Sequence, residues 1–302
     1  MASEKFSAWI SAFRFRTLPL ALSSILLGSF IAAYQQKFDW SIALLAISTT
    51  LFLQILSNLA NDYGDGIKGT DNLERIGPNR AIQSGAISIR EMKNMIVVFI
   101  LLSLVSGIAL LAVAFPKDML NSALFFLILG IVAIAAAIKY TVGKTAYGYH
   151  GMGDLFVFLF FGITGVVGTY YLHTLTLAWE VFLAGAAVGF LSAGVLNLNN
   201  MRDRISDSKA GKNTLVVKIG GRAAKAYHAF LIIGAVLSTA AFILLFELGV
   251  WSWIFLATSP LLASNLVRVF KNKEPRSLDP LLKQLALTTL LFVLLLGVGS
   301  LI

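Results

Sequence analysis

The chain alternates between long apolar runs and shorter polar connections. A helix needs about 20 mostly apolar residues to cross a bilayer. Nine runs approach or exceed that length, at residues 18–34, 40–58, 94–115, 119–138, 154–173, 178–198, 228–247, 250–268 and 282–302. Aromatic residues or proline mark several of their ends, as is usual at membrane interfaces. The pattern predicts an all-α, polytopic membrane protein with nine transmembrane helices in one domain, residues 1–302.

The composition also favours a membrane protein. Hydrophobic residues make up 58% of the 302 residues and charged residues 13%, whereas soluble domains carry about 25% charged residues. The chain has no cysteine, which excludes disulfides and thiolate metal ligands. It shows no Ser-His-Asp grouping and no histidine-rich metal spacing, so a hydrolytic function lacks support.

The basic residues are distributed unevenly among the connections. Of the 24 Lys and Arg residues, 22 fall on alternate connections that start with the N-terminal segment, and two fall on the others. Because Lys and Arg are retained on the cytoplasmic side, we expect the N-terminus inside and the C-terminus outside. The net charge of +9 then reflects membrane topology, and no basic-aromatic module predicts nucleic-acid binding.

Two cytoplasmic connections, about 58–93 and 199–227, open with the same polar pattern. The first reads NLANDYGD and the second NNMRDRISD. Each places an amide and two carboxylates at intervals of three or four residues, which stacks the side chains on one face of a helix. The two clusters consist of Asn58, Asp62 and Asp65, and of Asn199, Asp203 and Asp207. Their matching positions after an apolar span indicate an internal repeat of helical units.

The chemistry of the two clusters suits a magnesium ion. Carboxylate and amide oxygens are hard ligands for Mg²⁺, which commonly bridges to substrate phosphates, so two facing clusters predict a site for a metal-bound diphosphate. The alternative is a solvated surface in which acids pair with neighbouring bases. Both clusters begin within an apolar helix, where an aspartate costs about 2.5–3.5 kcal/mol at mid-membrane. That cost favours a functional site.

A diphosphate also needs cationic partners, and three cytoplasmic connections supply them. They contribute Lys68, Arg75, Arg80, Lys139, Lys144, Arg202, Lys209 and Lys212. Gln83 follows Arg80 in RIGPNRAIQSG, so we expect it near the same ligand. In YGYHGMGD, Asp154 is an N-cap, a third acid near the site, or both. His150 stands alone in that segment, where a single histidine is more often a surface residue than a base.

These motifs resemble the two aspartate-rich motifs of the UbiA superfamily of intramembrane prenyltransferases. NLANDYGD and NNMRDRISDSKAGKNTLVVKIG carry that resemblance. Three further stretches are similar to the branch that prenylates 1,4-dihydroxy-2-naphthoate in menaquinone synthesis: FRFRTLPLALSSILLGS, DYGDGIKGTDNLERIGPNRAIQSG and YGYHGMGDLFVFLFFGITGVVGTYYLHT. The similarity runs from about Arg14 to beyond Gly220, and the last three spans match in hydropathy alone.

The resemblance implies a fold, a location and a reaction. Nine helices would surround a central cavity in a bacterial inner membrane, with the active site toward the cytoplasm. A polyprenyl group would pass from a polyprenyl diphosphate to 1,4-dihydroxy-2-naphthoate, with loss of diphosphate and CO₂, to give demethylmenaquinone. The cofactor would be Mg²⁺, as two ions, with Mn²⁺ as an alternative. The oligomeric state is left open.

The resemblance also assigns roles to residues of the two motifs. The metal ligands would be Asn58, Asp62, Asp65, Asn199, Asp203 and Asp207. Arg80, Lys144 and Lys212 would bind the diphosphate, with Tyr140 near the reacting carbons. The first motif of the superfamily often has a third acid where this chain has Gly69. Asp71 lies two residues further on, and its role stays open.

Two other functions remain as alternatives. A related enzyme would use the same metal motifs with another aromatic acceptor, such as 4-hydroxybenzoate or homogentisate, and only its acceptor pocket would differ. A cation-coupled transporter would place acids near the bilayer midplane and on both sides. Here the acids collect at one face, which disfavours transport.

Overall fold

The computed structural model describes residues 2–70 and 80–302, and every regular element in those two stretches is a helix. In chain order these are α1 (Ala2–Phe13), η1 (Phe15–Thr17), α2 (Leu18–Tyr34), α3 (Trp40–Lys68), α4 (Ile89–Ala114), η2 (Lys117–Met119), α5 (Leu120–Lys139), η3 (Tyr147–His150), α6 (Gly153–Val157), η4 (Phe158–Val167), α7 (Gly168–Thr174), α8 (Val181–Lys209), α9 (Leu215–Leu245), η5 (Val250–Thr258), α10 (Ser259–Lys271), η6 (Pro275–Leu278) and α11 (Asp279–Ser300). Among them η4 is a π-helix, and the other η elements are 3₁₀-helices.

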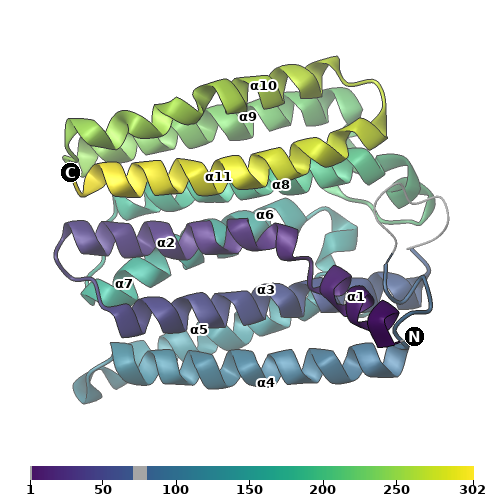
Figure 1. Cartoon of the computed structure of the whole chain (residues 1–302), viewed down its shortest axis with the longest axis horizontal. Coiled ribbons are helices and arrows are strands. Elements are labelled where there is room, and N and C mark those ends of the chain that lie inside the picture. Colours follow the sequence, from purple (N-terminus) through teal and green to yellow (C-terminus); the bar gives the residue numbers. More distant parts are fainter. Residues whose placement is uncertain (1, 71–79) are drawn as a thin grey trace.

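The prediction of nine spans is confirmed. In the described part of the chain, nine helical segments are long and apolar enough to cross a membrane, from Lys5–Tyr34 to Pro275–Ser300. They lie roughly parallel to one another in a single bundle, with the two chain ends at opposite ends of it (Figure 1). An odd number of spans requires that arrangement of the termini. The first span is broken at Arg14, whose backbone is left-handed (φ 51°).

Both acidic clusters lie in helices rather than in connections. α3 continues through the first cluster to Lys68, and Gly69 ends it with a left-handed backbone (φ 68°). α8 likewise continues through the second cluster to Lys209. The predicted connections 58–93 and 199–227 are therefore too long. Beyond each apolar run, polar residues such as Asp65 and Asp203 line an internal cavity. The helix can therefore continue past the apolar run, because its polar residues are accommodated inside the bundle.

The middle of the fifth span is the π-helix η4, which packs closely on α8. A Cβ atom added to Gly162 would lie 2.5 Å from the carbonyl oxygen of Gly185, so no larger residue permits this approach. Ser24 in α2 donates its hydroxyl to the carbonyl oxygen of Phe161. π-helices are rare and often occur at functional sites. In this chain η4 contributes Phe160 and Phe161 to the wall of the internal cavity.

The apolar interior is divided into two main cores. The larger core joins α2, η4 and the helices from α8 to α11, with Leu27, Leu191 and Phe292 at its centre. The smaller core joins α1, α3 and α4, where Leu56 and Met92 are fully buried, and α5 packs against it. Residues from both groups of helices line the cavity, so the cavity lies between the two cores.

Candidate active site

A cavity of about 410 Å³ lies inside the bundle. Its polar residues include Arg14, Asn61, Asp65, Arg80, Asn199, Asp203, Asp207 and Lys212. These gather where α3 and α8 end. The rest of the wall is apolar and includes Leu111, Phe126, Ile134, Phe156 and Phe160. A cavity with a charged end and an apolar interior suits a ligand with an anionic head and a long hydrocarbon tail.

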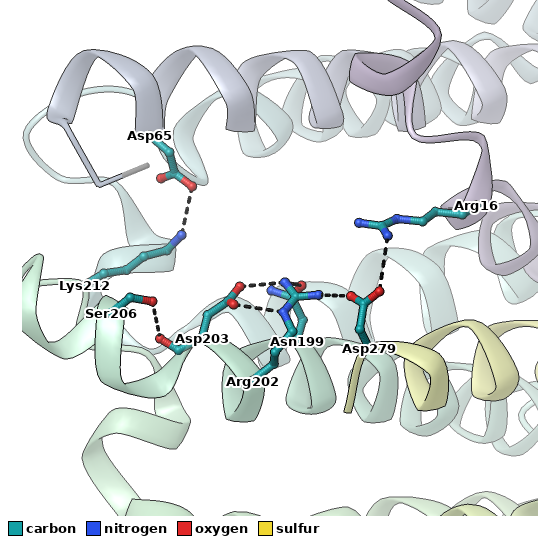
Figure 2. Close-up of polar contacts among 8 residues, drawn as sticks. All are labelled: Arg16, Asp65, Asn199, Arg202, Asp203, Ser206, Lys212 and Asp279. Carbon is teal, nitrogen blue, oxygen red and sulfur yellow. Dashed lines mark hydrogen bonds and ion pairs between the residues drawn. The ribbon is translucent and has the colours of Figure 1, made fainter. Parts of the chain in front are cut away.

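Asp65 is the carboxylate of α3 that faces this cavity, and both of its oxygens are bonded. The hydroxyl of Tyr149 donates to Oδ1 at 2.8 Å. The ammonium of Lys212 donates to Oδ2 at 3.0 Å (Figure 2). Asp65 is only 2% exposed, so water competes little with either bond. Because Lys212 follows α8, the ion pair joins the two acidic helices.

Asn58 and Asp62 were predicted as metal ligands, but neither is among the residues that line the cavity. Asp62 accepts a hydrogen bond from the backbone N–H of Ala81 at 3.2 Å. Asn58 donates to the carbonyl oxygen of Phe13 at 3.0 Å. Toward the polar end, the polar residues of α3 that line the cavity are instead Gln54, Ser57, Asn61 and Asp65. Their spacing of three or four residues is visible in the sequence, but the acidic pattern pointed to a neighbouring face. Metal binding by Asn58 and Asp62 stays a prediction.

The second cluster lies on the facing wall, in α8. Asn199, Asp203 and Asp207 all line the cavity, as their helical spacing predicts. Asp203 and Asp207 are buried. Ser206, one turn away, donates its hydroxyl to the backbone carbonyl of Asp203 (Figure 2). The structure therefore brings Asp65 of the first cluster and all of the second cluster to one cavity.

Arg202 holds the second cluster in place. Its side chain is 1% exposed, and its Nε and Nη2 donate to the two oxygens of Asp203 at 2.9 and 2.7 Å. Nη2 also donates to Oδ1 of Asn199 at 2.9 Å, and Nη1 donates to Asp279 at the start of α11 (Figure 2). Asp279 in turn lies 3.9 Å from the guanidinium of Arg16. This network fastens α8 to α11 and orients the Asp203 carboxylate.

The Lys212 side chain remains protonated at neutral pH. Burial alone would lower the pKa of Lys212, but the carboxylates of Asp65 and Asp207 raise this pKa above the ordinary value for lysine. A raised lysine pKa means that the stabilisation from the ion pair is fully present below the ordinary pKa. It is lost only as the pH rises through the raised value, so the pair persists through neutral and mildly basic solution.

The other predicted cations are divided between the cavity and the surface. Arg80 lines the cavity with Lys212, whereas Lys68 and Lys144 are exposed. The Lys68 ammonium lies 3.8 Å from the centre of the Tyr149 ring, which places it beside Asp65 in a cation–π contact. Lys144 does not line the cavity, so the structure does not bring it together with Arg80 and Lys212. Its role in diphosphate binding stays a prediction.

Several predictions concern the connections. The side-chain oxygen of Gln83 accepts a hydrogen bond from the backbone N–H of Arg80 at 3.4 Å, but Gln83 is not among the residues that line the cavity, so its contact with the same ligand stays a prediction. His150 is exposed, and its carbonyl oxygen accepts a hydrogen bond from Lys218 at 2.7 Å. Arg75, a predicted diphosphate partner, lies outside the described residues, as does Asp71.

The N-cap predicted at Asp154 is wrong. α6 begins at Gly153, so Met152 is the N-cap residue, without a side-chain hydrogen bond, and Asp154 lies inside the helix. Glycine at position 153 lets the Tyr140 ring pack against the start of α6, because a Cβ atom on Gly153 would lie 3.1 Å from that ring. Asp154 is buried and close enough to Tyr140 to raise the pKa of the Tyr140 phenol, which places a further acid near the cavity, beyond those of the two clusters.

Two residues at the polar end, Arg14 and Tyr149, were not predicted as site residues, and Arg202 was predicted as a cationic partner of the diphosphate although it pairs with Asp203. Arg14 follows α1, and its left-handed backbone leads into the cavity wall. Arg202 stands between the amide and the carboxylate of NNMRD, where a charge deep in an apolar helix was a signal of buried pairing. Tyr149 had no signal of this kind, because its partner Asp65 is far away in the sequence.

The donor set fits a magnesium ion that arrives with a phosphate ligand. Within residues 2–70 and 80–302, no three His, Asp or Glu side chains gather into a complete metal site. Mg²⁺ is usually bound by one or two carboxylates together with waters and substrate phosphates. Asp65 on α3 and Asp203 and Asp207 on α8 supply such an incomplete set of oxygen ligands on two facing walls.

Tyr140 is expected to act as a neutral phenol throughout the working pH range. Burial raises its pKa, and the carboxylates of Asp154, Asp65 and Asp207 raise it further. The protonated form therefore persists above the ordinary tyrosine pKa of about 10. We expect Tyr140→Phe to change kcat/KM by the same factor at every pH between about 7 and 9. Profiles measured for both proteins check this, and a ratio that changes with pH over that range would contradict it.

The chain was compared with known proteins. The family model described as the UbiA prenyltransferase family matches residues 21–299. The 1,4-dihydroxy-2-naphthoate octaprenyltransferase of Escherichia coli (strain K12) is 45% identical over 295 residues, which cover 96% of this chain and 95% of that protein. This similarity includes the last three spans, which the motifs alone did not reach.

Two solved structures share the fold. The apo structure of a UbiA homolog from Aeropyrum pernix K1 has a TM-score of 0.70 and 17% identity, with 95% of this chain and 97% of that chain covered. A UbiA homolog from Archaeoglobus fulgidus bound to GPP and Mg²⁺ has a TM-score of 0.59 and 19% identity, with coverage of 96% and 99%. At these identities the likeness concerns the fold alone.

Proposed function

The chain belongs to the UbiA prenyltransferase family, and on that premise we propose that it transfers a polyprenyl group from a polyprenyl diphosphate to 1,4-dihydroxy-2-naphthoate. Diphosphate and CO₂ leave, and the immediate product is the reduced, hydroquinone form of demethylmenaquinone. The observation that carries the proposal is the 45% identity, over almost the full length, to a protein named for this activity. The cavity supports it, because charged residues line one end and apolar residues line the rest.

The substrates would lie along the cavity according to their polarity. The diphosphate head would lie between α3 and α8, where Lys212 and Arg80 offer donors to its oxygens. The prenyl tail would lie against apolar and aromatic side chains such as Phe156 and Phe160. Those walls exclude water from the allylic cation that forms, and the faces of the rings attract its charge.

The reaction breaks one bond of the prenyl diphosphate and one bond of the acceptor, and it forms one new carbon–carbon bond between them. The bond between the first prenyl carbon and the diphosphate oxygen breaks, and that carbon bonds to the ring carbon that carries the carboxylate. The carboxylate then leaves as CO₂, and its electron pair restores the aromatic ring. Asp65, Asp203 and Asp207 would hold Mg²⁺, which when bound neutralises the charge that builds on the leaving diphosphate. Tyr140 lines the cavity as a neutral phenol.

The number of metal ions and the membrane orientation are part of the same proposal. One carboxylate wall on α3 and another on α8 support two Mg²⁺ ions, one at each wall, with Mn²⁺ as an alternative. The distribution of Lys and Arg supports a cytoplasmic N-terminus and a site that opens toward the cytoplasm of a bacterial inner membrane.

The proposal is tested with the purified full chain in detergent. We expect a labelled polyprenyl diphosphate and 1,4-dihydroxy-2-naphthoate to give the prenylated, decarboxylated product in the presence of Mg²⁺. EDTA should stop the reaction, and added Mg²⁺ should restore it, because the leaving diphosphate needs its charge neutralised. Product formation is measured by chromatography of the lipid extract.

Parallel reactions distinguish the acceptor. With 4-hydroxybenzoate or homogentisate in place of the naphthoate, we expect little or no prenylated product. Faster prenylation of either alternative would overturn the assignment of the acceptor while leaving prenyl transfer intact. Activity that is unaffected by EDTA would overturn the metal-assisted departure of diphosphate.

A further inference from the structure

A buried cation pairs with the carboxylates of each acidic helix, Arg202 with α8 and Lys212 with α3. The two cations differ in the number of hydrogen bonds that they donate. Arg202 donates four hydrogen bonds, to Asp203, Asn199 and Asp279, and is 1% exposed. The side chain of Lys212 donates one hydrogen bond among the described residues, to Asp65. An ammonium has three N–H donors, so Lys212 keeps donor capacity that Arg202 has largely used. Arg202 is thus a fixed partner, whereas Lys212 is held at one point.

The position of Lys212 bears directly on metal binding. Oδ1 of Asp65 accepts from Tyr149 at 2.8 Å and Oδ2 accepts from Lys212 at 3.0 Å. A cation that bound Oδ2 would face the positive ammonium at short range in a site shielded from water, where repulsion between like charges is strong. Asp65 therefore gains a metal ion at Oδ2 only as Lys212 withdraws.

A diphosphate would supply the place to which Lys212 can move. Phosphate oxygens are strong acceptors for an ammonium, and Lys212 already lines the cavity that Asp65 and Asp203 face. We infer that Lys212 is an exchangeable counter-cation, which holds Asp65 until a metal-bound diphosphate enters and then passes to the phosphate oxygens. This inference rests on the proposed function of the cavity as a diphosphate site.

Tyr149 is placed to keep Asp65 oriented during that exchange. Its hydroxyl donates to the oxygen that Lys212 does not use. The centre of its ring lies 3.8 Å from the Lys68 ammonium and 5.3 Å from the Lys212 ammonium, within the range of cation–π attraction. Lys212 can therefore leave the carboxylate without losing every favourable contact, while Asp65 keeps one fixed hydrogen bond.

Exchange has a consequence for the order of binding. A divalent cation alone must displace Lys212 without offering it another anion, so it should bind weakly. A cation that arrives with diphosphate offers phosphate oxygens to the displaced ammonium, so the two should bind together. The opposite expectation, a preformed metal site that fills before the diphosphate, follows if Lys212 is only a phosphate ligand.

The test measures Mn²⁺ binding to the full chain in detergent, in the absence of diphosphate, by electron paramagnetic resonance. We expect Lys212→Met to bind Mn²⁺ about tenfold more tightly than the unaltered protein, the size of effect seen when a group beside a metal ligand changes. The same variant should bind pyrophosphate with Mg²⁺ more weakly. Mn²⁺ affinity that is unchanged or reduced in Lys212→Met would overturn the inference.

Two further variants separate exchange from a general change in charge. Lys218→Met removes the same charge six residues away, from an ammonium that donates to a backbone carbonyl, and should leave Mn²⁺ affinity unchanged. In an Asp65→Asn background, Lys212→Met should give no gain in affinity, because the freed carboxylate is missing. A gain that survives Asp65→Asn, or that Lys218→Met reproduces, would count against exchange at Asp65.

A measurement on the unaltered protein covers the case in which the variant fails to fold. Mn²⁺ alone should raise the Tm little, and Mn²⁺ with pyrophosphate should raise it several-fold more. Equal increases would contradict exchange. Absence of prenyl transfer to the naphthoate by the unaltered protein would overturn the proposed function but not the exchange at Asp65, because these experiments detect binding of metal and pyrophosphate without turnover.

Discussion

Asp65→Asn should lower kcat/KM for prenyl transfer by about 100- to 1000-fold, the effect of removing one preorganised electrostatic contact from a transition state. Asn has the size of Asp and can still accept a hydrogen bond from Tyr149. It lacks the negative charge that pairs with Lys212 and that would bind Mg²⁺. The rate of product formation at several Mg²⁺ concentrations measures the loss, and the Tm of the variant verifies that it is folded.

Asp118→Asn is the matched control for Asp65→Asn. Asp118 lies in η2, at the start of the fourth span, on the side of the membrane away from the cavity's polar end. The same substitution there should leave prenyl transfer unchanged. If Asp65→Asn retained near-normal activity at ordinary Mg²⁺ concentrations, Asp65 could not be a metal ligand in the reaction.

Arg202→Met should be the most destabilising of the substitutions considered, at about 3–5 kcal/mol, the usual cost of removing one partner from a buried ion pair. Methionine fills much of the space of the arginine stem but removes the two hydrogen bonds that Arg202 donates to the buried Asp203 carboxylate. The link from α8 to Asp279 on α11 is lost with it. Thermal unfolding in detergent, followed by circular dichroism, measures the change.

Arg16→Met shows how much of that effect belongs to burial. Arg16 lies 3.9 Å from the same Asp279, but the side chains are 46% and 39% exposed. Exposed pairs contribute about 0.2–1 kcal/mol, so Arg16→Met should change the unfolding free energy by no more than that. A loss of stability as large as that of Arg202→Met would show that the outer end of the network carries the stability.

The nine spans could be predicted from sequence because the bilayer imposes the same cost on every polar residue, and hydropathy measures that cost directly. The ends of α3 and α8 could not. Hydropathy does not distinguish a polar face turned to water from one turned to an internal cavity, so the segments up to Lys68 and Lys209 were assigned to connections. The same polar pattern that misplaced the helix ends also predicted Asp65 and Asp203 as site residues, and both line the cavity.

The sequence predicted many residues of the site but not which of them form ion pairs with one another. Helical spacing relates residues three or four apart, and it placed Asp203 and Asp207 on one wall correctly. Lys212 and Asp65 are 147 residues apart in the chain, and no local rule connects them. Arg202 was assigned to the ligand, although it donates to both carboxylate oxygens of its immediate neighbour in the chain, Asp203.

The shortness of the link between α8 and α9 sets the time scale on which the site can respond. Lys212 is the central residue of five, and hydrogen bonds anchor the main chain on both sides of it, from Lys212 N to the carbonyl of Asp207 and from Asn213 N to that of Tyr149. Only side-chain torsions are left to move the ammonium. Rotations of exposed side chains take picoseconds to nanoseconds and loop motions extend to microseconds. A buried ammonium slowed to the microsecond range still moves faster than enzyme turnovers, which commonly take about a millisecond to a second. The Lys212 ammonium can therefore move between Asp65 and a bound phosphate many times within one catalytic cycle, without waiting for a lid to open.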